Sequence, residues 1–587
     1  MQLTRKLPLT VLIVGAAMLM GGALRLYQVS ERSMTHPEMF VPGIPLRADL
    51  SVPPPRMDLA RVIGSDLFWD THPPGYYILM LMVTKCFGTS TLALRLPSVL
   101  FGVASIGLVF WLGSLVGQRI PGCVAALLLA FSGYHIVWSR SARSYSMVCF
   151  LGLLATILLL LLARATRHRK AVEFGYAALM IYGICTYHPF WGLLATQMVW
   201  VLGNAWYRGG ELPRALNVQI LIMILASPLF AVAELQSRNE VSGLSSDVLL
   251  MGRQFIQFFF LIPMPFVDDT CPADRPPGLV IPQHYYWLLA VFFVFCALLL
   301  IVGVRQLRPA DDAPTDDISR PFAAFWSLAM IVATIAIVAL GMADAREIAS
   351  YGSSGVWGPT LKTVRAMAAL PLSMLIGAIV LNKFWHRLRN LGAKLPLRSL
   401  AGGQRLVLLI TIIPFAMLAF VSLFLRPLMN ARGLLYVEPF LLLTLACGIV
   451  AVARRSRWVA IPLVLILASL HAFSVEVYND RIISQGDFGG LAAKLTPQIR
   501  SGDLFFIHRD WYTTPILYYI RPDRYKVDAS DFTKAVQRDP QARVWVLLFG
   551  KESPEPGITQ ALQGYRQVET VDSYLGQAKL YCRDDCQ

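Results

Sequence analysis

The sequence predicts a polytopic α-helical membrane protein that ends in a small soluble α/β domain. Of its 587 residues, 56% are hydrophobic and only 15% are charged, whereas soluble proteins carry about 25% charged residues. Long apolar segments recur up to residue 474, and the residues beyond it have the mixed composition of a soluble domain. We therefore expect a transmembrane module over residues 1–474 and an α/β domain over residues 475–587.

The net charge of +16 does not indicate a nucleic-acid partner, because much of it lies in short loops between apolar segments. The most basic loops are 164–170, 208–214, 383–398 and 454–457. Lys and Arg in short cytoplasmic loops set the orientation of a membrane protein and need no anionic partner. We therefore expect membrane lipids, and no nucleic acid, among the partners of the chain.

The first apolar run, residues 7–26, is long for a signal peptide and has no clear small-residue cleavage site, so it predicts a retained first span. With the N-terminus in the cytoplasm, residues 27–95 form a first outer loop. Within this loop, residues 73–87 are apolar but number only about 15, against the roughly 20 that a span requires. The paired Tyr76 and Tyr77 favour a helix that lies along the outer membrane interface.

The remaining apolar segments alternate across the membrane and give about 13 spans in total, with the C-terminal domain outside the cytoplasm. These segments are 96–116, 122–138, 146–163, 172–187, 189–206, 216–234, 286–304, 322–342, 366–381, 406–425, 434–452 and 458–474. In the C-terminal domain, residues 503–507 and 544–549 predict strands, and residues 491–499 and 515–520 predict helices.

The first outer loop carries the clearest candidates for chemistry. Glu38 and Asp70 are carboxylates that could take a proton from a reacting group. His36 and His72 could act as proton carriers, as hydrogen-bond donors to a phosphate, or as metal ligands. A divalent ion held between a carboxylate and a histidine is an open alternative. A Pro-rich outer loop with a few charges is also often only solvated, so residue types alone do not decide the matter.

Three motifs give the chain a resemblance to a known family. They are Asp70-Thr71-His72-Pro73-Pro74-Gly75-Tyr76-Tyr77, Ala142-Arg143-Ser144-Tyr145, and Arg432 followed by Tyr436 and Pro439. This order resembles the family 39 glycosyltransferases of GT-C architecture, which include protein O-mannosyltransferases and bacterial aminoarabinose transferases. The similarity covers roughly residues 28–206, and beyond them it is mostly architectural.

The resemblance implies a GT-C fold with juxtamembrane helices in the first outer loop, here in the cell membrane, with the bacterial inner membrane as the expected location. It also implies a polyprenyl-phosphate sugar as donor, used on the outer face to transfer a hexose or pentose. The acceptor stays unknown and could be a lipid, a glycan or a protein. Direct displacement would invert the anomeric centre.

The chain departs from the family at one position. Members usually carry an Asp-Glu pair shortly after the first span, with the Asp as base, and here Pro37 precedes Glu38. The base therefore stays open between Glu38, Asp70 and His36.

Arginines at the predicted outer turns are candidates for the donor phosphate, because a guanidinium fork suits a phosphate. Arg143 and Arg432 match the family motifs, and Arg140 and Tyr145 lie beside Arg143. Snorkelling at a helix end is the alternative explanation for such arginines. Tyr76 and Tyr77 are expected at the interface, next to the substrate.

Two other classes of function stay open. A lipid or sugar transporter would need ionisable residues deep within the spans and often paired halves, and the sequence shows few of the former and no repeat. A catalytically degenerate subunit of an envelope-assembly complex is the other, because the family's Asp is missing. Cys582 and Cys586, in the polar tail, could form a small disulfide loop outside the reducing cytosol.

Overall fold

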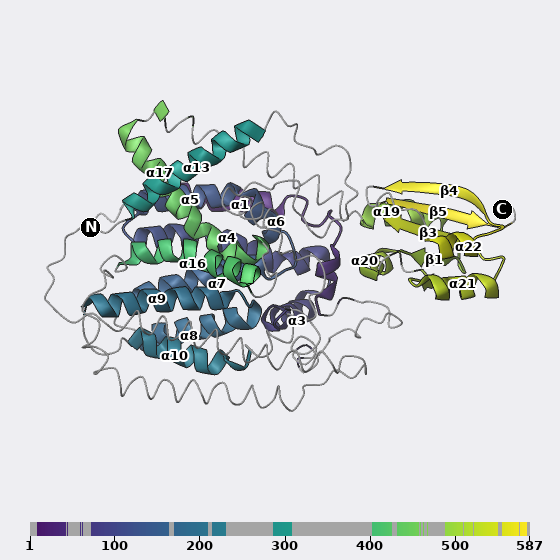
Figure 1. The fold of residues 1–587 in the computed structure, drawn as a ribbon, viewed down its shortest axis with the longest axis horizontal. Helices are drawn as coiled ribbons and strands as arrows, with labels where there is room; N and C mark the ends of the chain where they lie inside the picture. The colour runs from purple at the N-terminus through teal and green to yellow at the C-terminus, as the bar shows by residue number, and fades with distance from the viewer. Residues whose placement is uncertain are drawn as a thin grey trace, which may run out of the picture.

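A computed structural model describes residues 9–42, 44, 59, 62, 72–163, 169–208, 214–229, 286–307, 402–424, 431–456, 458–459, 462, 467, 488–508, 510–520, 522–549, 555–573 and 576–583. These residues form a bundle of apolar helices and, at the C-terminal end, a five-stranded sheet with short helices on both faces (Figure 1). The sheet lies at one end of the long axis of the molecule, beyond the ends of the bundle helices (Figure 1).

Helix α1 (Leu9–Leu26) confirms that the first apolar run is helical. The other long helices of the bundle are α4 (Thr91–Leu115), α7 (Tyr145–Leu162), α8 (Arg169–Thr186), α9 (Phe190–Arg208), α10 (Arg214–Ala226), α13 (Tyr286–Gln306), α16 (Gly403–Phe424) and α17 (Glu438–Arg455). Their bounds agree with the predicted segments to within a few residues at most ends. The segments predicted at 322–342 and 366–381, and most of 458–474, lie outside the described residues.

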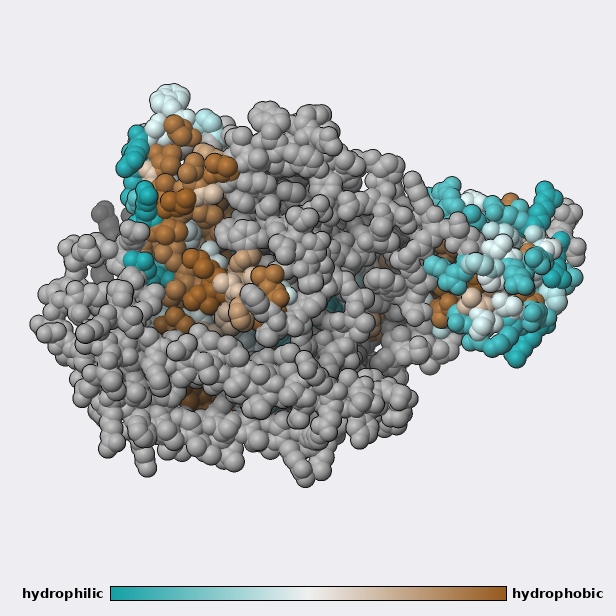
Figure 2. Space-filling model, viewed as in Figure 1, coloured by the Kyte–Doolittle hydropathy of each residue, from teal (hydrophilic) through white to brown (hydrophobic). Residues whose placement is uncertain are grey.

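By length and composition, five of the described helices could cross a membrane, or six if one bent pair counts as a single span. The total of about 13 spans therefore stays a prediction. Large apolar side chains on α13 and α16 are exposed, among them Val294, Leu298, Ile412 and Phe420. Figure 2 shows hydrophobic side chains gathered over this part of the bundle, whereas the C-terminal region is mostly hydrophilic. An exposed apolar surface of this kind is typical of a protein that faces lipid.

The predicted short helix in the first outer loop is present as α3 (Gly75–Phe87). It ends at Gly88, whose φ of 77° only glycine adopts readily. Tyr76 and Tyr77 are buried where α3 packs against α4 and α8. A short 3₁₀ helix, η1 (His36–Phe40), precedes α3 in the same loop. The position of α3 at the membrane interface stays a prediction.

The segment predicted as one span at 122–138 is two helices, α5 (Arg119–Phe131) and α6 (Gly133–Ser139), which meet at an angle of 60°. Ser132 lies at the break in an extended conformation, and its Oγ accepts a hydrogen bond from the His135 N–H. A serine at this position offers the first N–H groups of α6 an alternative to continued helix. The apolar composition of the segment did not reveal the break.

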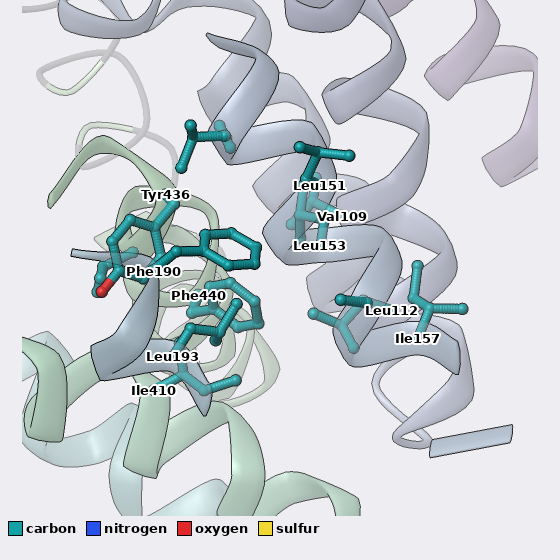
Figure 3. Close-up of a cluster of buried hydrophobic side chains, with 14 of the residues drawn as sticks. Val109, Leu112, Leu151, Leu153, Ile157, Phe190, Leu193, Ile410, Tyr436 and Phe440 are labelled. Carbon is teal, nitrogen blue, oxygen red and sulfur yellow. The ribbon is translucent and has the colours of Figure 1, made fainter. Parts of the chain in front are cut away.

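Helix α17 is preceded by a 3₁₀ helix, η4 (Ala431–Val437), which packs against α7. The core of the bundle lies around this junction, where buried side chains of six elements meet (Figure 3). The side chains labelled in Figure 3 are Val109 and Leu112 of α4, Leu151, Leu153 and Ile157 of α7, Phe190 and Leu193 of α9, Ile410 of α16, Tyr436 of η4 and Phe440 of α17.

The C-terminal sheet has the strand order β2-β1-β3-β5-β4. Its strands are β1 (Leu504–Ile507), β2 (Arg524–Lys526), β3 (Val544–Phe549), β4 (Arg566–Ser573) and β5 (Gly576–Cys582). Strands β2, β1 and β3 run parallel, and β3, β5 and β4 run antiparallel. The two predicted strands are confirmed as β1 and β3, the buried central ones. The other three were missed because they are short or rich in polar residues.

Alternate residues of β1 pack on opposite faces of the sheet. Phe505 and Ile507 pack with α19 (Phe488–Leu495) and α20 (Asp510–Tyr519). Leu504 and Phe506 pack with α21 (Ala529–Arg538) and α22 (Pro556–Ala561). A short 3₁₀ helix, η5 (Thr496–Gln498), follows α19. The sheet is therefore covered by helices on both faces, as the parallel strands require.

Replacing Gly448 of α17 with alanine should destabilise the bundle, because a Cβ atom there would lie 2.1 Å from the Leu299 carbonyl oxygen of α13. Overpacking of this kind costs about 1–3 kcal/mol. Gly15→Ala in α1 is the matched control, since nothing lies within 4 Å of the new Cβ. Thermal unfolding in detergent measures both variants. Equal melting temperatures would contradict the close packing of α13 on α17.

Candidate functional site

A buried ion pair between Glu38 and Arg95 joins the first outer loop to α4. Arg95 Nε donates to Glu38 Oε1 and Nη2 donates to Oε2, each at 2.8 Å, and the two side chains are 1% and 3% exposed. This bidentate geometry is the strongest that a guanidinium and a carboxylate can form. The pair therefore fixes η1 against the N-terminal end of α4.

Arg95 also binds the backbone of the turn that follows α1. Its Nη1 donates to the carbonyl oxygens of Val29 at 2.8 Å and Arg32 at 3.0 Å, and its Nη2 donates to Ser33 at 2.9 Å. One side chain thus holds both the turn and η1. This role was not predicted from the sequence, although an arginine within an apolar helix by itself indicates a buried partner or a functional site.

The Glu38 carboxylate has its hydrogen-bonding positions occupied. Besides Arg95, it accepts from the Thr35 N–H at 2.9 Å, the Thr35 hydroxyl at 3.1 Å and the Ala142 N–H at 2.7 Å. Burial alone would raise the pKa of Glu38, but the Arg95 charge and these hydrogen bonds hold it below its usual value. A carboxylate held in this way is suited to organising a loop, and it has no free oxygen facing a reacting group.

Arg143 contacts two other predicted site residues, His72 and Tyr77. Its Nη2 lies 2.8 Å from His72 Nε2, and its Nη1 donates to the Tyr77 hydroxyl at 3.2 Å and the Pro37 carbonyl at 3.1 Å. A guanidinium can only donate, so His72 Nε2 accepts and the imidazole is neutral in this arrangement. Residues of the His-Pro-Pro motif and the Ala-Arg motif, about 70 positions apart, therefore form one site.

Tyr76 reaches the same site through Ser98 of α4. The Ser98 hydroxyl donates to the Arg143 carbonyl at 3.1 Å and lies 3.4 Å from the Tyr76 hydroxyl. Both predicted tyrosines thus adjoin Arg143, Tyr77 by its hydroxyl and Tyr76 through one serine. The consequence is that α3 is held to the turn between α6 and α7.

Positive charge accumulates around this site. Burial and the charge of Arg95 lower the pKa of Arg32 to about 10. Burial and the charges of Arg32 and Arg95 lower the pKa of Arg140 to about 9. Arg140 Nη2 also donates to the Tyr27 carbonyl. With Arg143, four buried arginines lie around the Glu38 turn, and such a concentration of guanidinium groups favours anions.

The remaining predicted residues are placed as follows. Tyr145 is buried in an aromatic cluster, with its ring 4.6 Å from Trp138 and 5.8 Å from Tyr187. Leu435 of η4 belongs to the same cluster. The Arg432 and His36 side chains, and all of Asp70, lie outside the described residues.

A second buried polar network lies at the break between α5 and α6. Arg25 donates to the carbonyls of Leu129 at 3.1 Å and Ala130 at 3.0 Å, which end α5, and lies 2.9 Å from His135 Nδ1. Ser132 donates to Glu438 Oε1 at 2.5 Å. These contacts satisfy carbonyls that the break leaves unpaired. They stabilise the bend that places Arg140 and Arg143, and the sequence analysis missed them.

Some of the predicted metal ligands and one of the two predicted disulfide cysteines are among the described residues. Among the described residues, no three His, Cys, Asp or Glu side chains lie together as metal ligands, but the predicted ligands Asp70 and His36 fall outside that search. Cys582 is disulfide-bonded. Its predicted partner Cys586 lies outside the described residues, so the pairing stays a prediction.

Glu38→Ala should reduce the free energy of unfolding by about 3–5 kcal/mol, because it leaves Arg95 buried without its partner.

Glu38→Gln should show a smaller loss of stability, and this loss should depend on pH. The folded-state pKa of Glu38 is below its usual value of 4.5, so the carboxylate stabilises the protein at neutral pH, and this contribution is lost as the pH falls through the folded-state pKa. The difference in melting temperature between wild type and Glu38→Gln should therefore narrow from about pH 7 to about pH 3. A difference that stays constant over this range would contradict the ionised pair.

Comparison with known proteins agrees with the motifs. Residues 71–231 match the model of the dolichyl-phosphate-mannose-protein mannosyltransferase family. No curated protein sequence matches the chain.

Several solved structures are similar in outline. ArnT from Cupriavidus metallidurans bound to undecaprenyl phosphate is 13% identical, with a TM-score of 0.48 over 98% of each chain. The archaeal oligosaccharyltransferase AglB from Archaeoglobus fulgidus, in complex with an inhibitory peptide and a dolichol-phosphate, is 12% identical, with a TM-score of 0.45 over 98% of this chain and 74% of that one. The arabinofuranosyltransferase AftD from Mycobacteria is 10% identical, with a TM-score of 0.43 over 99% of this chain and 42% of that one. The resemblance to family 39 glycosyltransferases is confirmed by the match over residues 71–231, which contain the His72 motif from Thr71 onward and the whole Arg143 motif.

Proposed function

We propose that the chain is an integral membrane glycosyltransferase that moves a sugar from a polyprenyl-phosphate donor to an acceptor on the outer face of the membrane. The observation that carries the proposal is the convergence of His72, Tyr77 and Arg143 within a group of buried arginines. A concentration of guanidinium groups at the end of an apolar bundle suits the phosphate of a lipid carrier. The family match over this part of the chain, to enzymes named for a dolichyl-phosphate sugar, supports the same donor class.

The reaction is a direct displacement. A nucleophilic atom of the acceptor attacks the anomeric carbon, the bond from that carbon to the phosphate oxygen breaks, and its electron pair leaves with the polyprenyl phosphate. Arg143 would bind the departing phosphate bidentately, with Arg140 and Arg432 adding charge. Arg143 would exchange its contact with the neutral His72 for the phosphate, and Tyr145 would brace the turn that carries Arg143.

For the base we favour Asp70 over Glu38 and His36. The Glu38 oxygens are occupied by Arg95, Thr35 and Ala142, so Glu38 is assigned the role of positioning the loop. Asp70 precedes His72 by two residues in the sequence, and His72 is a partner of Arg143. A carboxylate that near in the chain to the proposed phosphate site could take the proton of an acceptor.

The proposal includes the orientation and the domain limits. Residues 1–474 would form the transmembrane module, with the N-terminus in the cytoplasm, and residues 475–587 would form a domain outside it. The first outer loop and the turns that carry Arg143 and Arg432 would then share the outer face.

Arg143→Ala should lower turnover by about 10²–10³-fold, the usual effect of removing a group that stabilises transition-state charge. Arg143→Lys should recover part of it, since a lysine keeps the charge without the fork. The assay follows release of sugar or free polyprenyl phosphate from radiolabelled donors by purified protein in detergent. Arg169→Ala is the control, because Arg169 pairs with Glu173 on the partly exposed start of α8, a helix that carries none of the proposed phosphate-binding residues. Full activity of Arg143→Ala would refute the phosphate role.

Asp70→Asn should abolish transfer to an acceptor while leaving the melting temperature unchanged, because it removes the base and keeps the volume. The same assay with each donor measures it. If Asp70→Asn stays active, the base would have to be His36 or Glu38. If folded wild-type protein turns over no donor at all, the degenerate subunit becomes the better explanation.

A further inference from the structure

Two helices of the C-terminal region contact the first outer loop directly. The Tyr519 hydroxyl of α20 accepts a hydrogen bond from the Met34 N–H at 2.7 Å, and the Ser33 hydroxyl accepts one from the Gly489 N–H of α19 at 2.9 Å. Helix α20 also packs against η1. The contact therefore falls on the two residues that precede the Thr35–Glu38 turn.

The residues at this contact are buried, as in a protein interior. Met34 is fully buried, and Tyr518 and Tyr519 are partly buried against the core of the helical bundle. A Cβ atom at Gly489 would lie 2.9 Å from the Ser33 hydroxyl oxygen, so a larger side chain would crowd this hydrogen bond. The C-terminal region is thus seated on the loop by hydrogen bonds and by side-chain packing.

The contact leads to the site through a short series of bonds. The Ser33 carbonyl accepts from Arg95 Nη2, and Arg95 holds Glu38. Glu38 accepts from the Ala142 N–H, and Ala142 precedes Arg143. Each member of the series is buried or nearly so, and a displacement of residues 33–34 would therefore shift the groups that hold Arg143.

We propose that α19 and α20 of the C-terminal region hold the first outer loop in its catalytically competent position, with the Tyr519 hydroxyl as the positioning group. The proposal rests on the glycosyltransferase function proposed above and adds a role for this region in the chemistry of the site. In the competent state the region is docked on the loop, and it need not leave during turnover.

Tyr519→Phe removes the acceptor of the Met34 hydrogen bond and keeps the ring. We expect kcat for donor turnover to fall by about three- to tenfold, the effect of one lost hydrogen bond, with KM for the donor unchanged. Tyr565→Phe is the matched control, since the Tyr565 hydroxyl donates to the Pro540 carbonyl within the same region, away from the loop. An unchanged kcat in Tyr519→Phe would overturn the proposal.

A designed disulfide gives the complementary test. A Cβ atom at Gly489 would lie 3.9 Å from Ser33 Cβ, within the range of about 3.5–4.5 Å that disulfides require. The test uses a triple variant with Ser33→Cys, Gly489→Cys and Tyr519→Phe. Oxidation should raise its kcat toward the value of the protein that keeps Tyr519. Reduction of the disulfide should lower kcat again. Gly489→Cys alone controls for oxidation elsewhere. Loss of activity on oxidation would show that the region must undock, which would overturn the proposal.

Hydrogen exchange separates this inference from the proposed function, because it needs no turnover. Peptides containing Met34 and Ala142 would be followed by mass spectrometry in wild type and Tyr519→Phe. Faster exchange at both sites supports the series of bonds, even if no donor is consumed and the glycosyltransferase proposal fails. Faster exchange at Met34 alone would show that docking does not reach the site, and would overturn the inference.

Discussion

The site depends on one buried ion pair, Arg95 with Glu38. Two opposite charges can be buried together only when their geometry is good and their remaining hydrogen-bonding positions are filled. Here both conditions hold, because Arg95 also binds three backbone carbonyls and Glu38 also binds two backbone N–H groups. The pair therefore joins four separate pieces of chain: the turn after α1, η1, α4 and the turn before α7.

The other arginines around this pair give the site its character. Arg32, Arg140 and Arg143 are buried close by. Burial and the charge of Arg95 lower the pKa of Arg32, and burial and the charges of Arg32 and Arg95 lower the pKa of Arg140. Keeping several guanidinium groups together away from water is costly without anions beside them. A lipid-linked phosphate bound here would add such an anion.

The apolar segments and the motifs of the chain were readable from sequence because each is a local property. The helices α4, α7 and α16, and the short helix α3, follow from the length of their apolar runs. Arg143 and His72 were found because they lie in recognisable motifs. Strands β4 and β5 were missed, since their polar residues alternate poorly and their pairing is set by distant neighbours. The break at Ser132 was missed because its stabilisation comes from Arg25 and Glu438 on other helices.

The sequence by itself determined that this is a helical membrane protein with a polar, Pro-rich first loop and a family resemblance centred on His72 and Arg143. Only the tertiary structure decided which groups surround Glu38. In the sequence it is a carboxylate beside a histidine, and it qualifies as a base. In the fold its partners come from residue 95 and residue 142, which no local pattern could supply, and these contacts occupy its oxygens. The role of a charged residue follows from its neighbours in space, and those neighbours are set by the packing of the whole bundle.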